Sequence, residues 1–341
     1  MAQIDPALDV SPATESAAPV RRLIPGIASR PRTLWGDAWR RFHRHKLAMI
    51  GSAVLLLLIV IIAFGPLVYR VDKEDLDFTA VQSPDIVSRV IQTLTTGTTS
   101  DGLGITLAHP MGTDDLGRDI FARVLYGGRI SLLVGFVAMA IAVGLGSLVG
   151  ALAGFFGGII DQILMRVTDL FLSLPVLPLL LVTIYLFRDQ TTRALGPVLG
   201  IFMIVVVMIG ALAWMSTARI VRASFMSLKE KEFVEAANAL GVSRGSIMFK
   251  HILPNVLSPI IVAATLEIGN AIIAESTLSF LGVGFPPDTP TWGRLVTDYY
   301  QSLQVAPYMA IWPGMMIFLS VLSINFIGDG LRDALDPRSR L

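Results

Sequence analysis

Carboxylate and amide side chains lie inside an apolar stretch of this 341-residue chain. Glu267, Asn270 and Glu275 fall within the apolar run Leu257–Leu281. A carboxylate exposed to lipid is destabilising, so such groups in a membrane helix face the protein interior or an aqueous path. Two carboxylates and an amide on such a path could take up the cationic end of a substrate. Pairing with Arg or with backbone groups for structure alone is the other interpretation, and the sequence leaves both open.

Residues able to do chemistry are not arranged as a catalytic site. The four histidines, His43, His45, His109 and His251, form no cluster with metal-ligand spacing, and we expect each to be solvated or capped. The Gly-rich run Gly144–Gly158 lacks the Lys-Ser/Thr pair that ends a phosphate-binding loop. The absence of cysteine excludes disulfides, thiolate metal ligands and thiol nucleophiles. We therefore expect no enzyme activity, cofactor or metal in this chain.

The composition indicates a protein that uses lipid as solvent on part of its surface. Hydrophobic residues make up 53% of the chain, only 16% are charged, and the mean hydropathy is +0.67. Soluble domains carry about 25% charged residues. The 27 Lys and Arg against 26 Asp and Glu give a net charge of +1, without the basic excess of a nucleic-acid binder. These values exclude a disordered chain and disfavour a soluble enzyme.

Six apolar runs are long enough to cross a membrane, which takes about 20 residues per helix. We therefore expect an all-α membrane protein with six transmembrane helices. The short segment Arg188–Arg193 separates the third run from the fourth and is expected to reverse the chain. No cleavage site follows the first run, which is typical of an uncleaved signal anchor. The runs are Leu47–Val68, Ile130–Phe156, Leu170–Phe187, Leu195–Trp214, Leu257–Leu281 and Met309–Ile327.

The distribution of Lys and Arg predicts that both termini are cytoplasmic. With the N-terminus inside, 18 of the 27 basic residues lie in inside segments and 9 in outside segments, and cytoplasmic segments carry such an excess. Within the outside segment, the Thr/Gly-rich stretch Thr93–Thr106 is expected to be a loop. The expected organisation is a cytoplasmic tail (1–46), the first transmembrane helix (47–68), an extracytoplasmic segment (69–129), a core of five helices (130–327) that includes a cytoplasmic loop (215–256), and a cytoplasmic tail (328–341).

Small residues and prolines mark two of the expected helices. Glycines spaced four residues apart form a face without side chains, which lets another helix approach closely. That face is either ordinary tight packing or a seam that slides as the protein changes state. Two prolines in the third run each remove a backbone donor, giving either a static kink or a gating hinge. The residues are Gly146, Gly150, Gly154 and Gly158, followed by Pro175 and Pro178.

The cytoplasmic loop 215–256 predicts a small helical knob. Arg219–Leu240 has an amphipathic pattern, and Gly241 suits a helix end that needs a left-handed residue. Ser243 can cap the next short helix, and Pro254 fixes the start of the fifth span. A knob too small for a core of its own is best suited to docking on another protein.

The residues of this knob resemble a known motif. Glu235-Ala236-Ala237, Gly241 and His251-Ile252-Leu253-Pro254 are similar to the EAA motif of ABC importer permeases, E-A-A-x3-G-x9-I-x-L-P. His251 stands where the general pattern has Ile, as expected of the peptide-permease branch. Together with the knob, three further blocks extend the resemblance from residue 37 to the C-terminus, with the insert near 76–106 unmatched. They are His109–Asp114 with Leu116–Asp119 and Tyr126–Arg129, Glu275–Phe285 with Trp292-Gly293, and Gly328–Asp333 with Asp336–Arg338.

The resemblance implies the C-type transmembrane subunit of the dipeptide/oligopeptide (nickel/opine) permease family, with the type I ABC importer (MetI-like) fold in a bacterial inner membrane. Its implied partners are a second permease subunit, two ATP-binding subunits that hold the ATP and Mg, an extracytoplasmic binding protein, peptide substrate and lipid, with no nucleic acid. The residues it implies for coupling to the ATP-binding subunit are Glu235, Ala236, Ala237, Gly241, His251, Leu253 and Pro254.

Other functions stay open at this point. The same importer type could carry nickel chelates, opines or glutathione. A stand-alone secondary transporter would show an inverted repeat, and a membrane scaffold or sensor would leave the buried carboxylates and the kinked span without a role. A gene neighbourhood with a second permease, ATPases and a binding protein would distinguish the importer from both.

Overall fold

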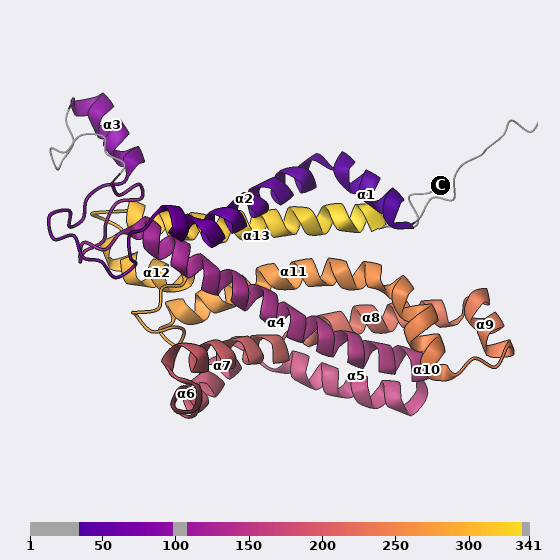
Figure 1. Ribbon diagram of the computed structural model, residues 1–341. Helices are drawn as coiled ribbons and strands as arrows, with labels where there is room; N and C mark the ends of the chain where they lie inside the picture. The colour runs from indigo at the N-terminus through magenta and orange to yellow at the C-terminus, as the bar shows by residue number, and fades with distance from the viewer. Residues whose placement is uncertain (1–33, 98–107, 336–341) are drawn as a thin grey trace, which may run out of the picture.

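The computed structural model describes residues 34–97 and 108–335, and the regular elements within these ranges are helices (Figure 1). Residues 1–33, 98–107 and 336–341 lie outside the described part, and with them most of the N-terminal tail, Asp336–Arg338 and most of the stretch Thr93–Thr106. The described start of that stretch, Thr93–Thr96, is the last turn of a helix instead of the expected loop. The α-helices are α1 (Leu34–Arg44), α2 (Lys46–Val68), α3 (Ile86–Thr96), α4 (Ile120–Phe156), α5 (Gly158–Ser173), α6 (Val176–Leu195), α7 (Pro197–Ala211), α8 (Trp214–Lys229), α9 (Glu232–Ala239), α10 (Arg244–Ser246), α11 (Leu253–Phe280), α12 (Trp292–Tyr299) and α13 (Tyr308–Leu335).

The expected class, an all-α membrane protein, is confirmed. Five helical stretches of the described chain are long and apolar enough to cross a membrane, and the bent pair α5–α6 makes a sixth if it counts as one crossing. The first run was predicted almost to the residue. The second begins at Ile120 instead of Ile130, because Asp119 caps the helix there. The five stretches are Lys46–Val68, Ile120–Phe156, Pro197–Lys229, Arg244–Phe280 and Tyr308–Leu335.

The predicted third span, Leu170–Phe187, is wrong as one helix. Its residues belong to α5 and α6, which meet at an angle of 85°. Leu174, the residue before Pro175, takes an extended conformation (φ −78°, ψ 139°), as steric conflict with a following proline requires. Pro178 lies in the first turn of α6, where no backbone donor is needed. The two prolines therefore end one helix and start another instead of kinking a single helix.

The chain reversal predicted at Arg188–Arg193 is also misplaced. These residues continue α6, and the turn comes at Gly196, whose φ is 85°. Pro197 then starts α7, in the first turn where its missing N–H is tolerated. A Cβ on Gly200 would lie 2.5 Å from the carbonyl oxygen of Thr191, so the two helices turn back on each other in close contact.

Most of the segment 215–256, predicted as a cytoplasmic loop, is helical and continues the neighbouring apolar stretches. The helix predicted for Arg219–Leu240 is two helices, because α8 ends at Lys229 and α9 begins at Glu232. After a break at Leu212 and Ala213, α8 completes the apolar stretch Pro197–Lys229 and packs along α4. Between the apolar stretches Pro197–Lys229 and Arg244–Phe280 lies α9, and together with α10, at the start of the second stretch, it forms a short knob.

The two ends of the molecule differ in content (Figure 1). One end, here the knob end, carries α1, the C-terminal end of α13 and the knob of α9 and α10. The other, the loop end, carries α3, α12 and the segments around them. Buried Trp292, Tyr299 and Ile120 fill the core near the loop end, and buried Phe225 and Ile247 fill it near the knob.

Candidate functional site

The knob is built around the end of α9. Val234 and Ala237 are buried against Phe225 and Ile247, whereas Glu235 and Ala236 are exposed. Gly241 has the predicted left-handed conformation, with φ 74°. Its N–H donates to the Asn238 carbonyl, and the Val242 N–H donates to the Ala237 carbonyl, which closes the helix end as a Schellman motif. A Cβ at Gly241 would meet nothing within 4 Å among the described residues.

A continuous helical rod joins the knob to the fifth apolar run. Ser243 caps α10 by accepting a 3.4 Å hydrogen bond from the Ser246 N–H, as predicted. A π-helical turn, Ile247–Ile252, leads directly into α11, where the Leu253 N–H donates to the Met248 carbonyl. Pro254 thus lies in a running helix instead of opening a new one. Residues Arg244–Phe280 therefore form one continuous helical stretch from the knob to the fifth apolar run.

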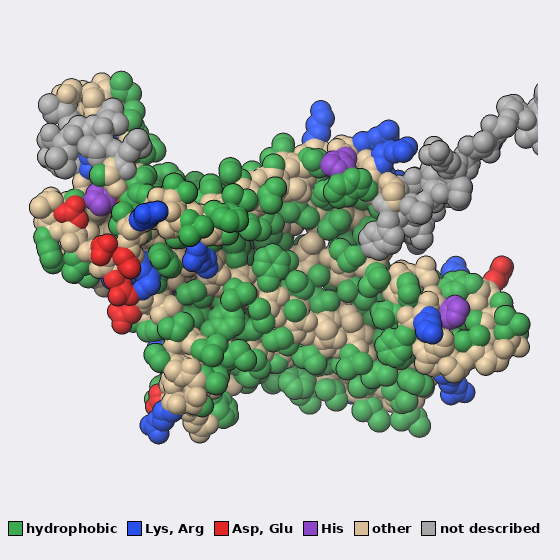
Figure 2. All heavy atoms as spheres, viewed as in Figure 1, with side chains coloured by type: hydrophobic (Ala, Val, Ile, Leu, Met, Phe, Trp, Pro, Cys, Tyr) green, Lys and Arg blue, Asp and Glu red, His purple; other side chains and the backbone are tan. Residues whose placement is uncertain are grey.

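Apolar side chains are exposed on the knob. Phe233 in α9 and Leu240 at its end are 42% and 84% exposed, and Phe249 in the π-helical turn after α10 is 55% exposed. Figure 2 shows hydrophobic side chains next to charged ones at the knob end. Large exposed apolar side chains next to charged ones are typical of a surface that contacts a protein partner. The knob therefore combines a rigid turn, exposed small residues and exposed apolar anchors.

Glu275 is enclosed where α11 meets α4 and α12. Its carboxylate is 0% exposed. It accepts hydrogen bonds from the hydroxyls of Ser279 at 2.8 Å, Thr291 at 2.8 Å and Ser131 at 3.3 Å. Ser131 also accepts from the Trp292 N–H at 3.1 Å. These three partners are hydroxyls from separate parts of the chain. The structural pairing expected from the sequence was with Arg or with backbone groups instead. Ser131 and Thr291 carried no signal in the sequence.

Glu267 has a different environment from Glu275. It is half-buried, and its side chain hydrogen-bonds Asn270, which lies one turn further along α11 and is exposed. Near them, α11 lies close to α13, since a Cβ on Gly328 would stand 2.6 Å from the Thr265 hydroxyl. The structure therefore places Glu267 and Asn270 together and leaves Glu275 apart from them, near the loop end.

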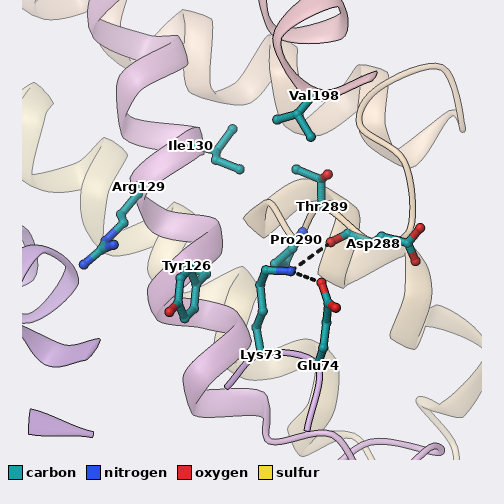
Figure 3. Close-up of a pocket in the computed structure, with 9 residues that line it drawn as sticks. All are labelled: Lys73, Glu74, Tyr126, Arg129, Ile130, Val198, Asp288, Thr289 and Pro290. Atoms are coloured by element: carbon teal, nitrogen blue, oxygen red, sulfur yellow. Dashed lines mark hydrogen bonds and ion pairs between the residues drawn. The ribbon is translucent and has the colours of Figure 1, made fainter. Parts of the chain in front are cut away.

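An open cleft of about 380 Å³ lies at the loop end (Figure 3). Lys73 forms an ion pair with Glu74 and reaches the Asp288 carbonyl at 3.4 Å. Tyr126 and Val198 add apolar surface. The cleft thus presents charges of both signs beside an apolar wall, a mixture that suits a zwitterion. Sequence reasoning missed Lys73, Glu74 and Asp288, because they lie in loop segments without a motif. The lining residues are Lys73, Glu74, Tyr126, Arg129, Ile130, Val198, Asp288, Thr289 and Pro290.

Arg129, on the edge of this cleft, serves the backbone of α2. Its Nε donates to the Ile62 carbonyl at 3.1 Å, and its Nη2 donates to the Ala63 carbonyl at 2.9 Å. Pro66, four residues after Ile62, has no N–H to offer that carbonyl. The guanidinium replaces the missing donor and also lies over the Tyr126 ring, 5.5 Å from its centre. Arg129 therefore compensates a proline in a membrane helix.

His109 joins two acidic residues at the loop end. Its Nδ1 lies 2.7 Å from Asp119 Oδ2, and its Nε2 lies 3.4 Å from Asp77 Oδ2. The Tyr69 hydroxyl donates to the same Asp119 oxygen at 2.6 Å, and the other Asp119 oxygen caps α4. The hydrogen bond with Asp119 raises the pKa of His109, against the opposing effect of burial. The group ties the loop after α2 to the start of α4, and His109 is paired instead of solvated.

The predicted glycine face contains three glycines instead of four. An added Cβ would lie 2.6 Å from the Trp214 carbonyl at Gly146, 2.4 Å from the Ala218 carbonyl at Gly150, and 2.6 Å from Phe225 Cβ at Gly154. All three therefore hold α8 in direct contact with α4. Gly158 lies beyond the end of α4, begins α5 with φ 55°, and has no described neighbour within 4 Å of its Cβ position.

The chain matches families of known proteins over most of its length. Residues 146–341 match "Binding-protein-dependent transport system inner membrane component", and residues 33–84 match "N-terminal TM domain of oligopeptide transport permease C". The chain is 40% identical to the oligopeptide transport system permease protein OppC of Haemophilus influenzae, covering 91% of this chain and 90% of that protein. It is 37% identical to the dipeptide transport system permease protein DppC of Alkalihalophilus pseudofirmus (90% and 90%). It is 35% identical to the glutathione transport system permease protein GsiD of Pectobacterium atrosepticum (90% and 92%).

Proposed function

The chain belongs to the family of inner-membrane permease components of binding-protein-dependent ABC transporters, and from this premise we propose that it forms half of a translocation path for di- and oligopeptides. It is a multi-pass inner-membrane protein, it is not itself the ATPase, and its family carries no cofactor. Its transporter type implies ATP-binding subunits and a substrate-binding protein as partners. Family membership removes the secondary transporter and the membrane scaffold from consideration.

The names of the similar permeases support a peptide as the substrate. The relatives named above transport oligopeptides, dipeptides and glutathione, according to their names. The charged and apolar lining of the loop-end cleft fits the two charged ends and the side chains of a peptide. Glutathione is the second candidate, because the identity to its permeases, 35–36%, is close to that of the oligopeptide permeases. Nickel chelates and opines have no such support here.

Within the path, we assign the interior carboxylate to Glu267. It is partly exposed, and its neighbour Asn270 is exposed as well, so both can meet a substrate that passes along α11. Glu275 is enclosed by hydroxyls and has no exposed surface. We therefore assign it a structural role, in which it holds α11, α4 and the start of α12 together beside the cleft. The break at Pro175 and the contact of α4 with α8 supply the places where helices can move.

The knob is the proposed docking element for an ATP-binding subunit, with both termini on the same, cytoplasmic side. Exposed Glu235 and Ala236 would contact the partner's groove, and Gly241 would fix the turn beside them. Ala237 and Leu253 keep the knob in shape, since they pack against its own core. The second permease subunit would cover exposed apolar helix faces of this chain. The excess of Lys and Arg toward this end supports the orientation.

The experiment is uptake by the complete importer in proteoliposomes. The chain is combined with its partner permease, ATP-binding subunits and binding protein, and uptake of labelled di-, tri- and longer peptides, glutathione and a nickel chelate is compared. ATP-dependent uptake of peptides that depends on this chain is the expected result. Glu267→Gln should change uptake while the complex still assembles. Uptake of the nickel chelate alone, or normal peptide uptake without this chain, would overturn the proposal.

A further inference from the structure

Helix α1 has one face buried in the protein and one face exposed. Ala38 and Phe42, one turn apart, are each 8% exposed and pack against the end of α13. The contact is close, because a Cβ on Gly330 would lie 2.3 Å from Ala48 Cβ and 3.3 Å from Phe42. Residues on the opposite face point away from the protein. They are Trp39, Arg40, His43 and Arg44, all exposed.

The position of α1 along the molecule sets it at a membrane surface. The adjoining helix α2 has 23 residues, a length of about 34 Å, slightly more than the roughly 30 Å of a hydrocarbon core. Its first residue, Lys46, therefore lies at the edge of the lipid, and α1 precedes it with His45 alone between them. The exposed face of α1 is consequently at the depth of the lipid head groups.

The chemistry of this face fits that depth. Trp39 is 64% exposed and lies edge-on to His43, with 4.4 Å between ring centres. An exposed indole is typical of the boundary between lipid and water. Around it are the exposed cations Arg40, Arg44 and Lys46, and Figure 2 shows basic and His side chains gathered over this helix. Asp333, at the end of α13, lies 3.6 Å from His45, so this ion pair involves neither Arg40 nor Arg44.

We infer that the exposed face of α1 binds the head groups of anionic phospholipids, with Trp39 at the level of the glycerol backbone and Arg40, Arg44 and Lys46 on the phosphates. A basic cluster beside a membrane helix attracts anionic lipid, and planar guanidinium groups bind phosphate through two hydrogen bonds. Because α1 also packs on the last turns of α13, bound lipid fastens the ends of α2 and α13 at one level. The inference depends neither on the transported substrate nor on which leaflet α1 faces.

The test measures which lipid stays with the purified full-length chain. The protein in detergent receives equal amounts of phosphatidylglycerol and phosphatidylcholine, and bound lipids are counted by native mass spectrometry. The wild type should retain phosphatidylglycerol in preference. Each exposed cation contributes about fivefold to anionic binding, so Arg40→Gln with Arg44→Gln should lower the apparent affinity for phosphatidylglycerol roughly 30-fold. Arg41 and Lys46 stay in place, which preserves part of the charge that sets topology.

Two controls decide the interpretation. Arg40→Lys with Arg44→Lys keeps the charge and should keep the preference. Arg70→Gln with Arg193→Gln removes two exposed arginines elsewhere and should also leave it intact. An equal preference for both lipids in the wild type, an unchanged preference in the α1 glutamine variant, or an equal loss in the Arg70 and Arg193 control would overturn the inference. If the α1 glutamine variant does not fold, the wild-type preference must fall with added salt, and a salt-independent preference would overturn it instead.

Discussion

Alanine at Gly150 should destabilise the protein, whereas alanine at Gly144 should not. Both glycines lie in α4 and receive the same methyl group. At Gly150 that methyl carbon would stand 2.4 Å from the Ala218 carbonyl oxygen and 2.8 Å from Val221 Cβ. At Gly144, which is exposed, it would meet nothing within 4 Å among the described residues. The pair therefore isolates the close contact with α8 from the helix propensity of the residue.

The expected size follows from these contacts. A non-bonded carbon and oxygen need more than 3 Å, so α8 would have to move by roughly 1 Å along a contact that also includes Gly146 and Gly154. Overpacking of this kind lowers the free energy of unfolding by about 1–3 kcal/mol. Replacing glycine by alanine inside a helix raises it by up to about 1 kcal/mol. Gly150→Ala should therefore lower the free energy of unfolding by about 1–2 kcal/mol, and Gly144→Ala should leave it equal or raise it by up to about 1 kcal/mol.

The assay is reversible unfolding of the purified chain in mixed micelles, followed by circular dichroism as the fraction of denaturing detergent rises. The free energy of unfolding is extrapolated to native micelles for the wild type and the two variants. If Gly150→Ala and Gly144→Ala have the same stability, or if Gly150→Ala is the more stable, α4 and α8 are not in the direct contact described, and the reasoning fails.

Three further predictions concern the loop end and the interior of the bundle. Glu275→Ala should lower the free energy of unfolding by about 2–4 kcal/mol, because it leaves three buried hydroxyls without their acceptor, and Glu275→Gln by less; equal losses in the same micelle assay would contradict this. The raised pKa of His109 means that its pairing with Asp119 and Asp77 adds stability that is fully present below the unfolded-state pKa of about 6.5 and is lost as pH rises through the folded-state pKa. Unfolding measured from about pH 5 to 9 should show this fall in the wild type and a flatter profile in His109→Gln; parallel profiles would refute it. Arg129→Lys should lower thermal stability, since an ammonium on a flexible stem lacks the rigid two-donor fork that meets the Ile62 and Ala63 carbonyls and the planar face that lies over Tyr126, and an unchanged melting temperature would refute that role.

The sequence predicts the helical spans well where a single run of apolar residues coincides with one helix. The run Leu47–Val68 is such a case, and so is the turn at Gly241, where the left-handed conformation requires glycine. The error at Leu170–Phe187 arises because apolar content does not distinguish a crossing helix from two helices joined at Pro175. The turn predicted at Arg188–Arg193 is wrong because polar content does not distinguish a turn from a helix that continues beyond its apolar run. Arg and Thr are tolerated in a helix, and α6 ends only at Leu195, before Gly196.

The candidate sites differ in how much of them a sequence can reveal. Glu275 was visible as a carboxylate in an apolar run, but its partners Ser131 and Thr291 come from other elements, 144 and 16 residues away. Ser131 is one hydroxyl within a long apolar helix and Thr291 is the N-cap of the short helix α12, so neither stands out before the fold brings them together. The cleft residues Lys73 and Asp288 could not be predicted for the same reason, because two loop segments and the helices α4 and α7, distant in the chain, come together to line the cleft. The knob could be predicted because its residues are contiguous.

Peptide uptake by a variant of the knob is the most direct test that this chain is a permease driven by separate ATP-binding subunits. Gly241→Asp adds a charged side chain beside the exposed tip, where no described atom obstructs it, at a conformational cost of about 1 kcal/mol for the left-handed residue. Gly245→Ala, four residues away and equally unobstructed, is the control. ATP-dependent peptide uptake should fall at least about tenfold in Gly241→Asp with the chain still in the membrane, and should persist in Gly245→Ala. If the ATP-binding subunits co-purify with Gly241→Asp and uptake continues at the wild-type rate, the knob does not couple the two.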